Sequence, residues 1–218
     1  MLIVLLIGHL NISNASKISM AYLYGNYDYT KLVTRNKNSL NVVSPSYFDL
    51  DNSGNLMLNT VDKNLVNEMH KKGIKITPFL SNHWDKAKGR AALTNTEKLS
   101  NDIVNAINKY NLDGVNVDIE NVTEKDRDNY TKLVRLLREK LPSDKIVSVA
   151  VAPNPYNWNT GWQGSYDYAK LSKYADYLMI MAYDEHYESG TEGAVAGIDF
   201  VEKSIKYALN YVDSEKIV

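Results

Sequence analysis

The chain has 218 residues, a formal net charge of −1 and no cysteine, and 44% of its residues are hydrophobic. This length and apolar content suffice for one globular domain with a sizeable core. The near-zero charge argues against nucleic acid or an anionic membrane as the main partner, and the lack of cysteine excludes a disulfide framework and thiol chemistry.

The first ten residues form an apolar run that is followed by a polar stretch. Ser13 and Ala15 satisfy the small-x-small rule of a signal-peptidase site, which predicts cleavage after Ala15. Residues 1–16 are therefore expected to be a signal peptide or leader, and the run is too short to cross a bilayer. Because no positively charged segment precedes the run, an unusual first strand is the alternative.

After this leader, strand-like and helix-like segments alternate. Strands are expected at 17–25, 40–49, 74–82, 113–121, 145–153 and 176–184, and residues 215–218 are expected to begin a further strand. Helices are expected at 62–73, 94–110, 123–141, 166–174 and 199–211. The first three helices have recognisable start signals, which are Asp62, a capping box from Thr94 to Glu97, and Thr123. Pro142 ends the third.

The strand at 113–121 alternates branched apolar residues with Asn116, Asp118 and Glu120. Residues i and i+2 of a strand lie roughly 6.6 Å apart, so Asp118 and Glu120 can act on one substrate. Where two carboxyls are buried together, the second holds its proton more tightly, which makes a general acid near neutral pH. A surface antiparallel strand would show the same alternation, so the pattern alone leaves that alternative open.

Strands separated by helices imply right-handed βαβ units and a parallel sheet. Six such units fit either an open doubly wound sheet or most of a (β/α)₈ barrel. The polar face of the strand at 113–121 favours the barrel, because such side chains need a lumen that opens to water at the carboxyl ends of the strands. We therefore expect an α/β fold, a (β/α)₈ TIM barrel that is incomplete, with about six βα units and the start of a seventh strand.

Residues 113–120 read DGVNVDIE and resemble the DGxDxDxE signature of family 18 glycoside hydrolases, the chitinase-like TIM barrels. Asn116 departs from that signature, which has Asp there, and is more similar to the branch of bacterial spore-cortex-lytic N-acetylglucosaminidases. Residues 181–186, MAYDEH, resemble the sixth-strand MxYD motif in the form typical of that branch. The resemblance implies a catalytic barrel over residues 17–218, and, since the family barrel has eight units, its C-terminal part is expected to be missing.

The resemblance also implies a retaining mechanism in which the 2-acetamido oxygen of the substrate attacks the anomeric carbon. Glu120 would protonate the glycosidic oxygen and later deprotonate the water. Asp118 would hydrogen-bond the acetamide N–H, and Tyr183 would donate its hydroxyl to the acetamide oxygen. Asn116 would lie deeper on the same face, and Met181 would line the floor beneath the sugar. Neither a cofactor nor a metal is implied.

Further substrate contacts are expected from residues that follow strands, where a barrel places its substrate loops. Aromatic rings there either stack on sugars or pack within the loop, and both interpretations stay open for each ring. The candidates are Trp84, Trp158, Trp162, Asp184, Tyr24, Tyr47, Asn82 and Asn154. His83 and His186 have no second ligand at metal-binding spacing, so no metal site is predicted.

The favoured function is a glycosidase acting on polymers of N-acetylglucosamine, with cortex peptidoglycan preferred because of Asn116 and the run from Asp184 to His186. The alternatives are a chitinase acting on chitin oligomers, a non-catalytic chitinase-like carbohydrate-binding protein, and an inactive remnant. Such binding proteins usually lack the acid, whereas Glu120 is present. The expected partner is polysaccharide or peptidoglycan, without nucleic acid and without a membrane in the mature form. The expected location is secreted, in the cell wall or on the spore, and the oligomeric state is left open.

Overall fold

The structure is a computed structural model and describes residues 17–25, 27–36 and 39–218, so the expected leader at 1–16 lies outside the described residues. Its strands are β1 (Met20–Leu23), β2 (Val42–Pro45), β3 (Phe48–Leu50), β4 (Leu56–Leu58), β5 (Lys75–Ile76), β6 (Phe79–Ser81), β7 (Gly114–Asp118), β8 (Ile146–Val151) and β9 (Tyr177–Ile180). Its helices are α1 (Tyr29–Arg35), α2 (Lys63–Lys71), α3 (Lys86–Thr94), α4 (Thr96–Tyr110), α5 (Arg127–Lys140), α6 (Gly161–Gly164), α7 (Tyr168–Tyr174) and α8 (Ile198–Leu209), with 3₁₀ turns η1 (Glu124–Asp126) and η2 (Ser214–Lys216).

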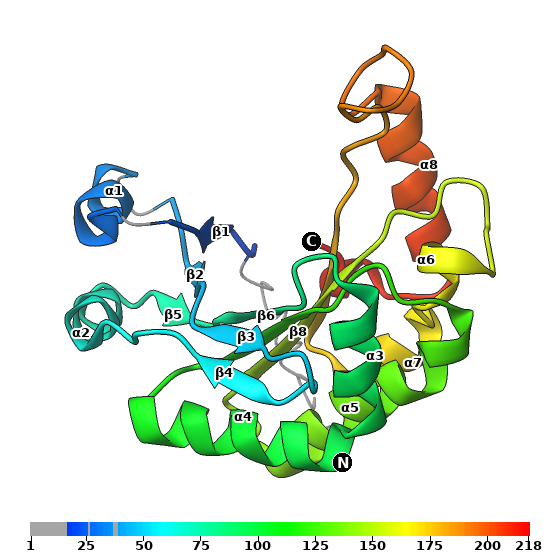
Figure 1. Ribbon diagram of the computed structural model, residues 1–218. Helices are drawn as coiled ribbons and strands as arrows, with labels where there is room; N and C mark the ends of the chain where they lie inside the picture. Colours follow the sequence, from blue (N-terminus) through cyan, green and yellow to red (C-terminus); the bar gives the residue numbers. More distant parts are fainter. Residues whose placement is uncertain (1–16, 26, 37–38) are drawn as a thin grey trace, which may run out of the picture.

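The strands form a curved wall, and helices cover its outer side (Figure 1). Hydrogen bonds join the strands in two groups, in the orders β1-β2-β5 and β4-β3-β6-β7-β8-β9. Every pair is parallel except the β3–β4 hairpin. Within the described ranges no pairing joins β1 to β9, so the wall is an open arc. The expected α/β class and the incomplete (β/α)₈ arrangement are confirmed.

Two of the expected strands are each divided by a bend. The segment 40–49 forms β2 and β3, and the segment 74–82 forms β5 and β6. Because β2 pairs with β5 while β3 pairs with β6, the two bends lie side by side. Pro45 and Pro78 stand at these bends, and proline lacks the N–H that a continuous ladder requires.

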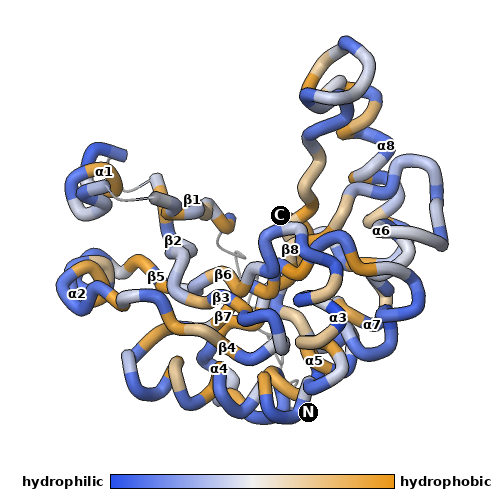
Figure 2. Tube along the Cα trace, in the orientation of Figure 1, coloured by the Kyte–Doolittle hydropathy of each residue, from blue (hydrophilic) through white to orange (hydrophobic). Residues whose placement is uncertain are grey.

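The hydrophobic core lies between the wall and its helices. Figure 2 shows apolar residues along the central strands and along one side of the covering helices. The expected apolar stripe of α4, which includes Leu99 and Ile103, is buried there. Val115 and Val117 of β7, with Ile119 just beyond it, are fully buried in the same cluster. Each such side chain contributes about 1.5–3 kcal/mol through its removal from water.

Two of the expected helix caps are confirmed. The Asp62 carboxylate accepts the backbone N–H groups of the first turn of α2, and Gly73 follows the end of that helix with a φ of 71°. Thr123 and Asp126 form a capping box at η1, which leads directly into α5.

The expected capping box from Thr94 to Glu97 is wrong. Thr94 is the last residue of α3, and its hydroxyl donates to the carbonyl of Arg90. Glu97 instead accepts a hydrogen bond from Lys140 of α5 at 2.6 Å. Asn95 separates the two helices and makes no side-chain cap bond. A Thr-x-x-Glu pattern is therefore ambiguous where one helix ends and the next begins at once.

Helices α1 and α3 and the β3–β4 hairpin were not expected from the sequence. Helix α3 buries only Gly89, Ala92 and Leu93, which is too short a stripe to give a clear period. Its start is nevertheless capped, because the Asp85 carboxylate accepts two backbone N–H groups of the first turn. Helix α6 likewise lies between the expected strand at 145–153 and the expected helix at 166–174.

The start of β7 is fixed by a buried carboxylate. One oxygen of Asp113 accepts the N–H of Ile76 at 2.9 Å and lies 2.7 Å from Nε2 of His70, while the other accepts a hydrogen bond from Lys75 at 3.0 Å. These contacts lower the pKa of Asp113 against the opposing effect of its burial. The residue therefore anchors the start of the strand to β5, which leads into the neighbouring strand β6, and to α2.

The chain reaches β9 once more at its end. Residues Ser214–Lys216 form η2, and Ile217 then makes a parallel bridge with Leu178. Val218 donates to the carbonyl of Leu178 at 2.9 Å and accepts from the N–H of Ile180 at 2.8 Å. The expected start of a seventh strand is confirmed at its last two residues.

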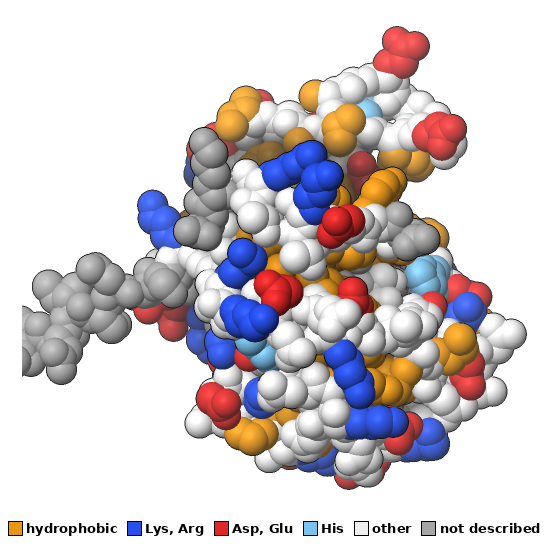
Figure 3. Space-filling model, turned by 90° about the vertical axis from the view of Figure 1, so that its left-hand side faces the viewer, with side chains coloured by type: hydrophobic (Ala, Val, Ile, Leu, Met, Phe, Trp, Pro, Cys, Tyr) orange, Lys and Arg blue, Asp and Glu red, His pale blue; other side chains and the backbone are white. Residues whose placement is uncertain are grey.

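The surface carries charges of both signs. On the face that Figure 3 presents, Lys and Arg side chains are interspersed with Asp and Glu, so no field of one sign develops there. Among the helices that the structure describes, none combines the length and the apolar character that a membrane span requires.

Candidate active site

Strand β7 brings the polar residues of the central motif to the edge where the parallel strands end. Asn116 and Asp118 are buried, and Glu120 is half-buried, two residues beyond the end of the strand. The expected alternation therefore holds within β7, whereas Glu120 belongs to the turn that follows. At this edge a side chain can face both the lumen and the solvent.

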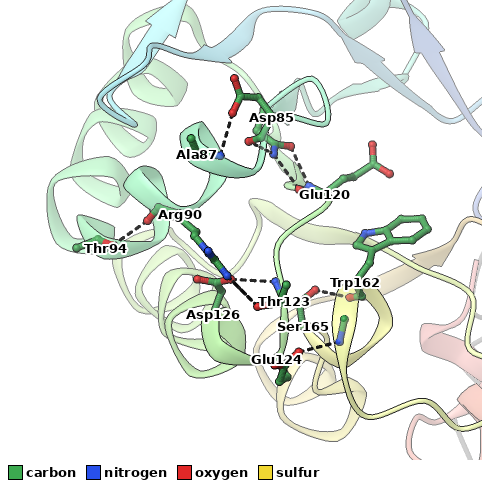
Figure 4. A network of polar contacts seen from close by, with 12 residues as sticks. Asp85, Ala87, Arg90, Thr94, Glu120, Thr123, Glu124, Asp126, Trp162 and Ser165 are labelled. Atoms are coloured by element: carbon green, nitrogen blue, oxygen red, sulfur yellow. Dashed lines mark hydrogen bonds and ion pairs between the residues drawn. The ribbon is translucent and has the colours of Figure 1, made fainter.

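Asn82 holds the backbone of Glu120 from the neighbouring strand end. Its side-chain oxygen accepts the N–H of Glu120, and its amide donates to the carbonyl of Glu120, both at 2.8 Å. Figure 4 shows the Glu120 side chain extending away from these contacts, on the side where Trp162 lies. Both main-chain groups of Glu120 are thus paired, and its carboxyl is left for chemistry.

Two buried tyrosines fix the preceding residue. The hydroxyl of Tyr130 accepts the N–H of Ile119 at 3.3 Å, and the hydroxyl of Tyr166 donates to the Ile119 carbonyl at 3.0 Å. The indole of Trp162 in turn donates to the Tyr166 hydroxyl at 3.0 Å. The turn that carries Glu120 is therefore held by α5 and by the loop after β8.

The following residues are anchored by a second polar network (Figure 4). Arg90 of α3 donates to Asp126 at 3.1 Å and to the Thr123 hydroxyl at 3.0 Å. Glu124 accepts the N–H of Gly161 at 2.7 Å, which joins η1 to the start of α6. Such side-chain locking is what keeps a catalytic carboxyl in one position.

Asp118 ends a chain of polar contacts that crosses the lumen. One of its oxygens accepts a hydrogen bond from Tyr22 of β1 at 3.1 Å, and the other is buried without a partner among the described residues. The Tyr22 hydroxyl accepts from the amide of Asn116, whose oxygen accepts from Ser148 of β8 at 2.8 Å. Asn116 is thus fully buried and lies deeper on the same face than Asp118, and its predicted part in substrate binding stays a prediction.

The two carboxyls, those of Asp118 and Glu120, have different pKa values. Burial raises the pKa of Asp118 to about 6, against the lowering effects of the Tyr22 hydrogen bond and of His83. Burial also raises the pKa of Glu120 to about 8, and the charges of Asp118 and Asp184 add to this effect. At neutral pH Glu120 therefore holds a proton beside an ionised Asp118.

The second motif lies against this pair. Strand β9 ends at Ile180, so Met181, Tyr183 and Asp184 belong to the loop after it. Met181 is buried, and Tyr183 is half exposed. Burial raises the pKa of Tyr183 to about 12, with further contributions from Asp118 and Glu120. The structure therefore brings Tyr183 and Asp184 together with the two carboxyls.

Trp84 lies beside the turn that carries Glu120. Its ring is 49% exposed and meets the ring of Trp162 edge-on, with centroids 4.8 Å apart. Its carbonyl accepts a hydrogen bond from the side chain of Asn121 at 2.8 Å. The exposed ring of Trp84, packed against the partly buried Trp162 next to the turn that carries Glu120, offers an apolar face to a sugar ring.

Two predicted substrate contacts are not supported, because both side chains are buried elsewhere. Tyr47 lies in the hydrophobic core, and burial raises the pKa of its hydroxyl to about 12. Asn154 is 1% exposed. Its side-chain amide donates to the carbonyl of Trp158 and accepts the N–H of the same residue. Asn154 therefore shapes the loop after β8.

The histidines make local contacts. His83 lies 3.0 Å from a carboxylate oxygen of Asp49, and Nδ1 of His186 lies 2.9 Å from the carbonyl of Ala194. Among the residues that the structure describes, no three His, Asp or Glu side chains are grouped as metal ligands would be.

Comparison with known proteins adds a family match. A model described as Glycosyl hydrolases family 18 matches residues 13–218. The uncharacterized glycosylase YvbX of Bacillus subtilis (strain 168) is 24% identical in an alignment 217 residues long that covers 94% of this chain and 63% of that protein. The cortical fragment-lytic enzyme of the same organism is 29% identical over 123 residues, which are 56% of this chain and 28% of the enzyme. The chain thus spans less than two thirds of either relative.

Solved structures share the fold. The spore cortex-lytic enzyme SleL of Bacillus cereus superposes with a TM-score of 0.82 at 22% identity, over 92% of this chain and 49% of that one. A chitinase from Chromobacterium violaceum superposes with the same TM-score of 0.82 at 24% identity, over 92% of this chain and 67% of that one. The arc of strands in this chain therefore has the same course as the corresponding part of both proteins.

Proposed function

Since the chain belongs to family 18 of the glycosyl hydrolases, we propose that it cleaves β-linked polymers of N-acetylglucosamine and that cortex peptidoglycan is its substrate. The observation that carries this proposal is the carboxyl of Glu120, whose pKa is raised to about 8 beside the buried Asp118. A carboxyl that keeps its proton at neutral pH can act as a general acid toward a glycosidic oxygen.

The proposed first step uses three side chains. The acetamido oxygen of the substrate attacks the anomeric carbon, the bond to the leaving sugar breaks, and Glu120 gives its proton to the departing oxygen. Ionised Asp118 accepts a hydrogen bond from the acetamide N–H and stabilises the positive charge that forms. Tyr183, half exposed in the loop after β9, donates its hydroxyl to the acetamido oxygen and orients it.

The second step restores the enzyme. Glu120, now ionised, takes a proton from a water molecule whose oxygen attacks the anomeric carbon and opens the cyclic intermediate. Two displacements at one carbon retain its configuration. Because the substrate's own amide acts as the nucleophile, Asp118 can remain buried and does not have to reach the anomeric carbon.

The choice of peptidoglycan is supported by the relatives and by Asn116. Proteins from Bacillus anthracis, Bacillus subtilis and Bacillus cereus that match about 56% of the chain are cortical fragment-lytic enzymes. On this ground we propose that the protein works outside the cytoplasm, in the spore or the cell wall. Chitin is the second candidate, because the exposed ring of Trp84, which packs against Trp162, suits a neutral N-acetylglucosamine chain equally well.

The test is the release of reducing ends from cortex peptidoglycan and from chitin oligomers. We expect Glu120→Gln to lower the rate by about 10²–10⁴-fold, the range for loss of a general acid–base residue. Glu68→Gln is the matched control, because Glu68 is exposed on α2 and contacts Lys71. Faster cleavage of chitin would favour the chitinase. Sugar binding without cleavage by the unaltered chain would contradict catalysis and favour a carbohydrate-binding protein.

A further inference from the structure

A hollow of about 280 Å³ lies between the loop after β8 and helix α8, and neither Asp118 nor Glu120 lines it. Its lining includes Asn157 from the loop, and Lys203, Lys206, Tyr207, Asn210 and Tyr211 from α8 and the residues just beyond it. The spacing of the last five residues, i, i+3, i+4, i+7 and i+8, places them on one face of the helix. We call this hollow the α8 groove.

Two aromatic rings line the α8 groove, and two more belong to the adjoining loop. The rings of Tyr207 and Tyr211 lie 5.1 Å apart. Tyr156 and Trp158 of the adjoining loop lie 4.9 Å apart, and they are 56% and 45% exposed. Exposed pairs of large rings are unusual on a surface without a ligand, and their flat faces match the C–H faces of sugars.

The loop is held in shape without a ligand. The amide of Asn154 closes it by bonding both the N–H and the carbonyl of Trp158, at 2.7 and 2.8 Å. Asn157 takes the left-handed conformation that the tight turn requires, with a φ of 58°. The same loop continues to Trp162 beside the catalytic turn, so the groove and the candidate active site share one rigid segment.

One positive charge of the α8 groove is available to a ligand. Lys206 is paired with Glu202 at 2.6 Å. Lys203 makes no ion pair with any residue that the structure describes, and its ammonium lies 5.6 Å from the centroid of the Tyr156 ring. The amides of Asn157 and Asn210 lie on the same lining and can bond an acetamido group.

We propose that the α8 groove is a second glycan-binding site and that it takes an N-acetylated sugar bearing a carboxylate, as in the acidic residues of a peptidoglycan strand. Lys203 meets the carboxylate, and the ring of Tyr156 lies under the sugar. The inference rests on the proposed function and narrows its substrate class, because a neutral chitin chain has no group for Lys203.

The experiment is titration calorimetry on the full chain carrying Glu120→Gln, so that no probe is cleaved. The acidic probe is a soluble tetrasaccharide that alternates N-acetylglucosamine with N-acetylmuramic acid, and the neutral probe is a tetramer of N-acetylglucosamine. We expect Lys203→Gln to weaken binding of the acidic probe about fivefold, the size of one exposed charge pair, and to leave binding of the neutral probe unchanged.

Lys109→Gln is the matched control. Lys109 also lies over a tyrosine ring, 5.2 Å from the centroid of Tyr110, but on α4, so its loss is expected to change neither affinity. Equal affinity of the Lys203→Gln chain and its parent for the acidic probe would overturn the site. An equal loss for both probes would also overturn it, because the lysine would then not recognise a carboxylate.

Failure of the proposed function gives a different result. Cleavage is assayed on the chain with Glu120 intact and on a short neutral substrate, which does not require the α8 groove. Absence of that cleavage with the Lys203-dependent binding preserved would reject the glycosidase and keep the groove. Normal cleavage without Lys203-dependent binding would reject the groove alone.

Discussion

At pH 7 the carboxyl of Glu120 keeps its proton while that of Asp118, two residues earlier, is ionised. Both are shifted upward by burial, yet Tyr22 donates a hydrogen bond to Asp118, and no described residue does so for the Glu120 carboxyl. The difference between an acid at about 8 and one at about 6 therefore comes from the contacts of each residue. This separation gives each carboxyl one role.

The pH dependence of kcat/KM follows from these values. Activity should rise as the pH passes about 6, where Asp118 becomes ionised, and fall as it passes about 8, where Glu120 loses its proton. Since the two groups interact, the pKa values measured from the two limbs belong to the pair and not to either residue alone. The measurement is the initial rate at low substrate concentration across pH 4–10, and a profile without the alkaline fall would contradict the role of Glu120.

Replacement of Tyr22 by Phe should move the acidic limb. In the parent chain the hydrogen bond from Tyr22 favours the ionised form of Asp118. Without it the pKa of Asp118 should rise, and the acidic limb should shift to higher pH by about one unit. Tyr24→Phe is the control, because the rings of Tyr22 and Tyr24 both lie near Phe79, with centroids 4.7 and 6.4 Å from it, whereas the hydrogen bond to Asp118 comes from Tyr22. An unmoved limb would show that Tyr22 does not stabilise the carboxylate.

The two motifs identify Glu120, Asp118 and Tyr183 as candidates, but not the residues that hold them. Tyr22 contacts Asp118 across 96 positions of the chain, and strand alternation predicts only which face it occupies. Asn82 follows an expected strand, which marks it as a candidate without indicating that it pairs with the backbone of Glu120, 38 positions away. Such partners become visible only when the strands are placed side by side.

Among the elements, β7 depends on a close approach to its neighbour. Gly114 has a φ of 152°, and a Cβ there would lie 1.9 Å from the carbonyl oxygen of Ile146 in β8. Since this oxygen belongs to the backbone, a side chain could be accommodated only by moving one of the two strands. The glycine of the central motif therefore sets the spacing of the strands that carry Asp118 and Ser148.

Gly114→Ala should consequently lower the free energy of unfolding by more than about 3 kcal/mol. Gly73→Ala is the matched control, because Gly73 also has a positive φ, 71°, but a Cβ there meets nothing within 4 Å. Its cost should be only about 1 kcal/mol, that of the left-handed conformation. Urea unfolding measures both, and equal losses would contradict the steric argument.

The elements that were predicted well are those with long, regular patterns. Helices α4 and α5 bury apolar stripes over three or more turns, and periodicity identifies both. The bends between β2 and β3 and between β5 and β6 were missed, because only two residues separate the halves, so each segment reads as one strand. The hairpin was missed for a related reason, since β4 has three residues and is partly exposed.

At the scale of the whole molecule, the open arc concentrates its polar residues at one edge. The carboxyl ends of β1, β6, β7 and β9 bring Tyr22, Asn82, Asp118 and Tyr183 to one place, although they come from distant parts of the chain. Alternation of strands and helices predicts this convergence, because parallel strands end on the same side. The cost is that two carboxyls are buried where an apolar core would be more stable.

That cost predicts how the stability of the whole chain depends on pH. Glu120 has an ordinary pKa of 4.5, raised to about 8 in the folded chain, so between these values the folded state holds a proton that the unfolded state releases. Stability therefore falls as the pH rises through this window. Glutamine carries no such penalty. Glu120→Gln should therefore be stabilised relative to the parent by up to about 4 kcal/mol more at pH 8.5 than at pH 5, at about 1.4 kcal/mol for each pH unit of the window, or by up to about 8–16 °C in Tm. Thermal unfolding of both chains at the two pH values measures the gain, with Glu68→Gln as the control for loss of an exposed carboxylate. A Tm difference that does not depend on pH would mean that Glu120 is not held protonated by its surroundings, and the proposed general acid would lose its physical basis.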